Sequence, residues 1–215
     1  LAACTKGANA KSIRKQPFSN IPAKQRAFSL KSSYMSAFAR RVIDRQLIPS
    51  LFNVDELKSK TTLQLLQERF APYIGKRVSE IAKLVDIPVT KNKAFNANLI
   101  SAVLGVKGTK LESLREFSKA NIKFKTIRLE PTGIPKEHMS FEQIDFHRWV
   151  NDAWEDSQLY EKFEYTKYLF VVFQYDETEK ENKNREPYLK GIMLWNMPEV
   201  VIEHELKELW KTTKA

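Results

Sequence analysis

The sequence is poor in cysteine and contains no long hydrophobic run. Its 215 residues include one cysteine, Cys4, which excludes an internal disulfide and a cysteine-based zinc site. No stretch reaches the roughly 18 consecutive apolar residues that a membrane-spanning helix needs. The first residues lack the apolar core of a secretory signal. These absences predict a cytoplasmic protein, and a chain that starts at Leu1 predicts a fragment of a longer one.

Motifs of several common enzyme classes are also missing. The sequence has neither a GxxxxGK[ST] phosphate loop nor a GxGxxG dinucleotide loop, and it has no GxSxG nucleophile elbow. His138, His147 and His204 lack the spacing of metal ligands, and we interpret them as surface or packing residues. Enzymes that depend on any of these motifs are therefore excluded.

Positive charge is in excess and unevenly distributed. The net charge is +10 and the isoelectric point is about 9.5. Residues 1–49 contain ten lysines and arginines against one acid, and residues 86–136 contain ten against four. Residues 137–215 reverse the balance, with ten against seventeen. Two basic zones beside an acidic one predict a surface that binds a polyanion; an uneven but merely solvated surface is the alternative.

The hydrophobic pattern predicts helices before residue 120. Helical spacing covers residues 33–46, 62–71, 78–85, 94–104 and 109–119. Ser79 is the expected N-cap of the third of these helices, and Thr109 and Glu112 have the spacing of a capping box in the fifth. Residues 1–32 are polar, basic and interrupted by proline, so no element is predicted there.

Alternating apolar and polar residues predict strands at 121–130, 168–175 and 188–195. In the first strand, Ile122 and Phe124 face one way, and Lys123 and Lys125 face the other. The second and third strands form a long-looped hairpin, and a final helix has Pro198 in its first turn. Residues 139–160 are helical or looped. The four tryptophans are predicted to be core residues: Trp149, Trp154, Trp195 and Trp210. The sum is an α/β fold of the mixed α+β kind, with a small mixed sheet.

One arrangement typical of catalysis lies around the first predicted strand. Metal-dependent nucleases hold Mg²⁺ with carboxylates on adjoining elements and place a lysine beside them. The usual form is an acid, a spacer, and then acid–any–lysine on a strand. Here Glu116 precedes Lys123-Phe124-Lys125 by seven residues, so the lysine is present but its acidic neighbour is another lysine. A positive group there repels Mg²⁺; solvated lysines on the polar face of a strand are the alternative reading.

Five longer segments within residues 62–211 carry a family resemblance. They are LQERFAPYIGKRVSEIAKLVDIPVTKNKAFNANLISAVLG, FSKANIKFKTIRL, TGIPKE, WEDSQLYEKF and LWNMPEVVIEHELKELW. Together they resemble the MutH family of mismatch-repair nicking endonucleases. The resemblance implies a restriction-endonuclease-like PD-(D/E)XK fold of the MutH type, with a mixed central sheet flanked by helices.

The resemblance implies that the metal site is lost. Ser101 and Lys123 stand at positions that carry glutamates in the family, and Glu116 stands at the position of an aspartate. The lysine of the motif is kept as Lys125. We therefore expect this domain to have no catalytic residue, no bound metal and no cofactor.

The resemblance also implies contacts with DNA. Lys93, Glu137 and Lys162 match positions that contact DNA or flank the active site in the family. We expect these residues, together with Lys125, to bind duplex DNA. Lys125 and Lys162 are expected near the backbone, and Glu137 near a base.

The first 44 residues resemble the C-terminal tail of a MutH-like domain. The matching segment is KGANAKSIRKQPFSNIPAKQRAFSLKSSYMSAFARRVI. Arg26 and Lys31 match an arginine and a lysine that read bases in that tail, whereas Ser32 replaces a second lysine. The predicted organisation is therefore a tail of a preceding unit (residues 1–46), a linker (47–61) and a degenerate MutH-like domain (62–215) without its own tail.

Tandem MutH-like domains with a degenerate second copy are the layout of a type II restriction endonuclease that cuts GATC. The resemblance implies a non-catalytic, DNA-binding domain that recognises GATC in duplex DNA as an allosteric effector. It also implies a catalytic N-terminal MutH-like domain in the same chain, which needs Mg²⁺, together with DNA-induced dimerisation and no contact with membranes. Two alternatives stay open: an active nuclease that uses Glu116, Glu130 or Glu112 as a ligand, and a purely structural domain.

Overall fold

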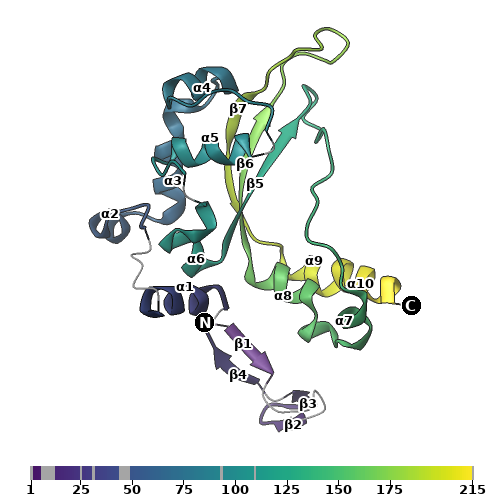
Figure 1. Cartoon of the computed structure of the whole chain (residues 1–215). Helices are drawn as coiled ribbons and strands as arrows, with labels where there is room; N and C mark the ends of the chain where they lie inside the picture. The colour runs from purple at the N-terminus through teal and green to yellow at the C-terminus, as the bar shows by residue number, and fades with distance from the viewer. Residues whose placement is uncertain are drawn as a thin grey trace.

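A three-stranded mixed sheet lies at the centre of the molecule (Figure 1). The computed structural model describes residues 2–5, 13–24, 26–30, 32–43, 49–92, 94–108 and 110–214. The strands are β5 (Ile122–Leu129), β6 (Lys167–Gln174) and β7 (Tyr188–Trp195), in the order β5-β6-β7. β5 runs parallel to β6, and β6 runs antiparallel to β7. The predicted mixed sheet and hairpin are confirmed.

Both faces of the sheet are covered, because apolar residues alternate along its strands. On one face, Ile122 and Phe124 of β5 join Leu169 of β6 in a first hydrophobic cluster. On the other face, Ile127 joins Tyr168 in a second cluster that is rich in aromatic side chains. Successive residues of a strand point to opposite faces, so each strand serves both clusters.

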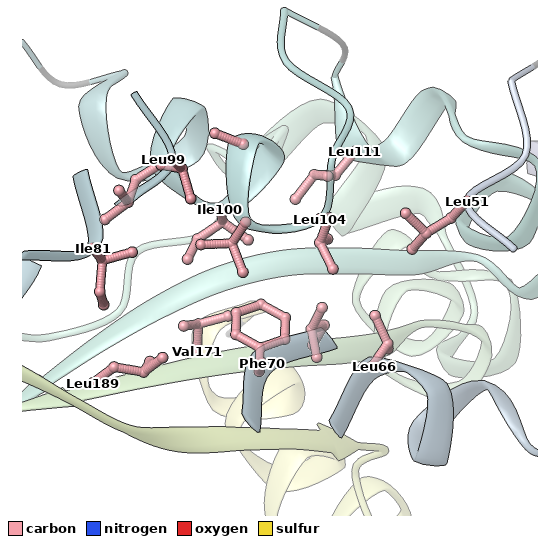
Figure 2. Packing of buried hydrophobic residues seen from close by; sticks show 14 of the residues in the cluster. Leu51, Leu66, Phe70, Ile81, Leu99, Ile100, Leu104, Leu111, Val171 and Leu189 are labelled. Atoms are coloured by element: carbon pink, nitrogen blue, oxygen red, sulfur yellow. The ribbon is translucent and has the colours of Figure 1, made fainter. Parts of the chain in front are cut away.

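Helices from the first part of the chain cover the first cluster. They are α3 (Thr62–Phe70), η1 (Ala71–Tyr73), α4 (Val78–Leu84), α5 (Phe95–Val103) and α6 (Arg115–Ala120). Leu66, Phe70 and Leu99 are fully buried, and Figure 2 shows Val171 of β6 and Leu189 of β7 in the same cluster. The helices predicted at 62–71, 78–85 and 94–104 are confirmed within one residue at each end.

Helices from the last third of the chain cover the second cluster. They are α7 (Phe146–Asn151), η3 (Trp154–Asp156), α8 (Gln158–Tyr165), α9 (Glu199–Val201), the π-helical turn η4 (Ile202–Leu206) and α10 (Lys207–Lys214). Trp149, Trp154 and Trp210 are buried, and Trp195 packs against them, so the prediction of four core tryptophans is confirmed. Within the described residues, no helix has the length and apolarity needed to cross a membrane.

The single helix predicted at 109–119 is divided in the structure. η2 (Leu111–Ser113) and α6 are separated by Leu114, whose backbone is extended at φ −65° and ψ 148°. Leu111 and Leu114 are both buried. Packing of these two leucines turns the chain and overrides the local helical pattern. Thr109, the predicted cap, lies outside the described residues.

Two predicted helix starts are displaced by one position or more. α4 is capped at Arg77 rather than Ser79, and the Glu80 carboxylate accepts a hydrogen bond of 2.7 Å from the Arg77 backbone nitrogen. The Ser79 hydroxyl instead donates to Glu186, 2.8 Å away. Pro198 is the N-cap of α9 and not part of its first turn. The contact between Ser79 and Glu186 joins positions 107 residues apart, which a local pattern does not show.

The N-terminal segment contains short strands that the sequence pattern did not predict. β1 (Ala2–Thr5) pairs antiparallel with β4 (Arg26–Ser29), and β2 (Ile13–Gln16) pairs antiparallel with β3 (Ser19–Lys24). These segments are too short and too polar to show a clear alternation. α1 (Ser32–Ile43), predicted at 33–46, lies against α6.

Residues 47–61, predicted as a linker, contribute to the first cluster. Leu51 and Phe52 are 8% and 3% exposed and belong to that cluster. α2 (Val54–Ser59) follows, and Asn53 and Glu56 form its capping box. The packed core of the described residues therefore begins before residue 62.

Leu66→Ala is expected to lower the free energy of unfolding by about 2–5 kcal/mol, because truncating a fully buried leucine leaves a cavity. Leu84→Ala is the matched control at a leucine that is 60% exposed, and we expect it to cost less than about 1 kcal/mol. Urea unfolding followed by circular dichroism measures both values. Equal effects of the two substitutions would contradict the core described here.

Candidate nucleic-acid interface

A groove of about 1410 Å³ opens beside β5. It is lined by residues of α6, β5, α8 and α10, together with residues 141–144, which precede α7. Its lysines are Lys110, Lys123, Lys125 and Lys162, and its acids are Glu112, Glu142 and Glu161. Two of these lysines, Lys125 and Lys162, meet over one aromatic ring.

The alternation of β5 places two of these lysines on the aromatic face of the sheet. In the parallel register, Lys123 lies opposite Tyr168, and Lys125 lies opposite Phe170. Residues paired across neighbouring strands point to the same side of a sheet. Among the described residues no strand pairs with the outer edge of β5, and both lysines line the groove there.

Phe141 holds two lysines in place. The Nζ atom of Lys125 lies 4.9 Å from the centre of its ring, and the Nζ atom of Lys162, on α8, lies 5.0 Å from the same centre. The Lys125 ammonium also donates a 2.8 Å hydrogen bond to the backbone oxygen of Ser140, and Lys162 forms an ion pair with Glu142. The face of an aromatic ring attracts cations, so residues 140–142 fix both ammonium groups over one ring.

The surroundings of Lys162 disfavour its charged form. Burial is the main reason that its pKa is lowered to about 8, and the positive charges of Lys125 and Lys123 lower the pKa further. Glu142 opposes this effect, but its side chain is 77% exposed and its charge is screened by solvent. At neutral pH, Lys162 is therefore mostly protonated, and it loses its proton as the pH rises through about 8.

Tyr168 is a buried tyrosine beside the groove. The residue is 1% exposed, and its hydroxyl group has no hydrogen-bond partner among the described residues. Burial raises the pKa of this hydroxyl to about 12, so it stays a neutral donor at physiological pH. Buried polar groups are nearly always paired, so this unpaired and inaccessible hydroxyl is an exception among the described residues.

The residues at the positions where the resemblance implies a lost metal site do not fit Mg²⁺. Both carboxylate oxygens of Glu116 are used, because one accepts from the Ser50 hydroxyl and the other accepts from the Leu51 backbone nitrogen at 2.9 Å. Ser101 is buried on α5, and neither it nor Glu116 lines the groove that contains Lys123. The described part of the chain has no cluster of three His, Cys, Asp or Glu side chains suited to a metal. A hard divalent cation needs several oxygen ligands, which this donor set lacks.

The other residues predicted to contact DNA have different placements. Glu137 follows the turn after β5, and its Oε1 accepts a 2.6 Å hydrogen bond from Nε of Arg128 in an exposed ion pair. Arg26 belongs to β4. Lys31 and Lys93 lie outside the described residues. The structure therefore gathers the groove lysines but does not place Glu137 among the residues that line the groove.

Sequence reasoning named three of the four groove lysines, and it missed Lys110 and the groups that arrange the others. Alternation placed Lys123 and Lys125 on one face, and the family resemblance pointed to Lys162. Phe141 lies in a segment for which the sequence predicted only helix or loop. Aromatic residues are common in that segment, and no local signal distinguishes the one that two distant lysines share.

Lys125→Gln is expected to raise the pKa of Lys162 above about 8, because it removes a neighbouring like charge. Lys83→Gln, at an exposed lysine of α4 outside the groove, is the control and should leave that pKa unchanged. NMR titration of a chain with ¹³C-labelled lysines measures the pKa. A wild-type Lys162 that titrates at the ordinary 10.5 would be inconsistent with this site.

Glu116→Ala is expected to lower the free energy of unfolding by about 1–3 kcal/mol, because the buried backbone N–H of Leu51 loses its acceptor. Glu112→Ala, at an exposed acid nearby, is the control and should have a smaller effect. Urea unfolding measures both. If the Glu116 variant is as stable as the wild type, the carboxylate does not have the structural role described here.

Comparison with known proteins finds one family model and one restriction enzyme to which this chain is similar. Residues 108–208 match the family model described as the DNA mismatch repair enzyme MutH. The chain is also 35% identical over 226 aligned residues to the type II restriction enzyme Sau3AI of Staphylococcus aureus. That similarity covers 99% of this chain and 45% of the relative, so the chain spans slightly less than half the length of that enzyme. The predicted resemblance and fold class are confirmed for residues 108–208, which match the MutH model and contain strands β5, β6 and β7 of the mixed sheet.

Proposed function

We propose that this chain is a non-catalytic, DNA-binding effector domain of a type II restriction endonuclease, and that it recognises GATC in duplex DNA. One observation carries the proposal: the groove beside β5 gathers Lys123, Lys125 and Lys162 but lacks the carboxylates of a metal site. A nuclease fold that keeps its cations and loses its metal ligands retains the means to hold DNA without cutting it.

The groove lysines supply affinity that does not depend on base sequence. Lysines that neutralise phosphates release condensed counterions, so the affinity falls steeply as the salt concentration rises. Lys125 and Lys162 act near the backbone in this way. Such contacts fix the position of the domain on the duplex, and selectivity has to come from groups that reach the bases.

Glu137 supplies part of that selectivity. Phosphates repel a carboxylate, so an acid near DNA is useful where it accepts a hydrogen bond from a base, most naturally from the N4 amino group of cytosine. In the free protein Arg128 neutralises Glu137. Their ion pair is exposed and costs little to open. On binding, Glu137 turns to a cytosine of GATC, and Arg128 becomes free to contact phosphate.

The remaining parts of the proposal concern a longer protein. The relative Sau3AI is about twice the length of this chain. We infer an N-terminal catalytic MutH-like domain in the same chain, which needs Mg²⁺ and which this domain activates when it binds a second GATC copy, with dimerisation on DNA. Arg26 and Lys31 then read bases for the preceding unit, and Lys93 contacts DNA from this one.

An active nuclease is the second candidate, and the position of Glu112 in the groove favours it. Two of the three acids considered are already engaged. Glu116 accepts hydrogen bonds from Ser50 and Leu51, and Glu130 accepts two from Arg185, of 2.6 and 2.7 Å. Glu112, the third acid considered, is exposed and lines the groove. A metal held there would have few further oxygen ligands, and for this reason we place the effector role first.

In a gel-shift assay with Mg²⁺, the chain is expected to bind a GATC duplex more tightly than a scrambled duplex of the same composition. It is expected to cut neither duplex. Glu137→Ala should weaken binding to GATC by about 1–3 kcal/mol and leave the scrambled duplex nearly unaffected. Glu208→Ala, at an acid of α10 that is 68% exposed, is the control. Gels that report both shift and cleavage provide the measurement.

Each alternative has its own outcome in these assays. Cleavage that vanishes in Glu112→Ala would support the active nuclease. A purely structural domain would give no salt-dependent shift of either duplex. If Glu137→Ala tightens binding to both duplexes equally, Glu137 only repels the backbone and does not read a base.

A further inference from the structure

Lys125 and Lys162 meet over the ring of Phe141, and Lys123 lies two residues from Lys125 on the same face of β5 and lines the same groove; we refer to the three as the lysine triad. We propose that the triad binds a single backbone phosphate of DNA, and that it takes the place of a divalent metal ion. The inference rests on the proposed function, since it names the group of the DNA that the groove binds. It adds that binding at this point needs no metal.

The triad carries more positive charge than its neighbours balance. Lys123 has no hydrogen-bond or ion-pair partner among the described residues. Lys125 donates to a neutral backbone oxygen, and Glu142 is the carboxylate that pairs with Lys162. The four lysines of the groove outnumber its three exposed acids, and the positive charge that remains favours an anion.

The hydrogen-bond donors of the triad fit an oxyanion better than a nucleobase or a cation. Ammonium groups donate hydrogen bonds and accept none. A base edge presents donors as well as acceptors, whereas the two free oxygens of a phosphodiester only accept.

The position of Lys123 explains why a metal is unnecessary. Metal-dependent nucleases use a divalent cation to neutralise the phosphate and to activate water. The acid–any–lysine motif recruits that cation with its acid, and here the acid is replaced by Lys123, which is itself a cation. An ammonium group can hold the phosphate but cannot generate hydroxide from bound water. The replacement therefore separates phosphate binding from cleavage.

Proton uptake is a signature of the occupied site. The charged groups that face Lys162 are Lys123 and Lys125 on β5 and Glu142 before α7, while Glu161 precedes it on α8. A bound phosphate adds negative charge beside an ammonium whose pKa is about 8, and so raises that pKa. Binding at pH 8 is therefore accompanied by uptake of a proton. Lys162→Arg removes this uptake, because arginine stays charged.

The main experiment measures binding of GATC and scrambled duplexes by fluorescence anisotropy, in EDTA and in Ca²⁺. We expect equal affinity in the two conditions for the wild-type chain. Lys123→Gln should weaken binding to both duplexes about tenfold and reduce the salt slope by about one unit. Lys83→Gln is the matched control and should change neither quantity. Calorimetry in two buffers of different ionisation enthalpy measures the proton uptake at pH 8.

Two outcomes overturn the triad and leave the proposed function intact. The first is duplex binding that requires a divalent cation, because the triad then does not replace the metal. The second is a Lys123→Gln variant that binds as tightly as Lys83→Gln, because no phosphate then sits at the triad. In both cases the chain still binds DNA.

Inorganic phosphate tests the triad even if no duplex binds. In a chain with ¹³C-labelled lysines, phosphate is expected to shift the resonances of the triad, to raise the pKa of Lys162, and to leave Lys83 unchanged. Such shifts without any duplex binding would uphold the triad and reject the proposed function. No shift at the triad, together with no duplex binding, would reject both.

Discussion

The parallel pairing of β5 with β6 is the constraint on which the rest of the structure depends. It runs along the whole strand, from Ile122 opposite Lys167 to Leu129 opposite Gln174. Because side chains alternate, a slip of one residue would expose the buried apolar face of β5 and bury its lysines. Burial of Ile122 in the first cluster therefore fixes the register, and the register in turn keeps Lys123 and Lys125 at the groove.

Acids near the sheet are used for structure. Glu116 links α6 to the segment at Ser50 and Leu51, and this link contributes to the first core. Near the other end of β5, Arg185 is held between Glu130 and the ring of Tyr175, with its guanidinium carbon 4.1 Å from the ring centre. These carboxylates are engaged in hydrogen bonds within the protein and do not line the groove, where four lysines outnumber three acids.

The sequence predicts the elements in which burial creates a regular period. The sheet and helices α3, α4 and α5 belong to this group, because their apolar residues repeat with period two or with helical spacing. The extended backbone at Leu114 was not predictable, because packing against distant parts of the core sets it. The strands of the N-terminal segment show no clear alternation, and the sequence pattern did not indicate them.

The candidate site likewise contains residues that the sequence predicts and contacts that it does not. Lys123 and Lys125 could be assigned to one face from the alternation of a single strand. The contact between Glu116 and the Leu51 backbone joins positions 65 residues apart and has no local signal. The same holds for Phe141, whose ring brings together lysines from β5 and α8. Residue type and spacing thus identify which groups are present, while tertiary contacts decide which of them meet.

The ring of Phe141 has a consequence for the entropy of association. A long lysine side chain loses about 1.5–2 kcal/mol of rotamer freedom when it is fixed. For Lys125 and Lys162, part of this loss occurs on folding, since both ammonium groups already rest over one ring. A flexible lysine on an open surface loses that freedom only when it meets its ligand. The groove is thus preorganised, and an anion that enters it finds two of the cations already restrained.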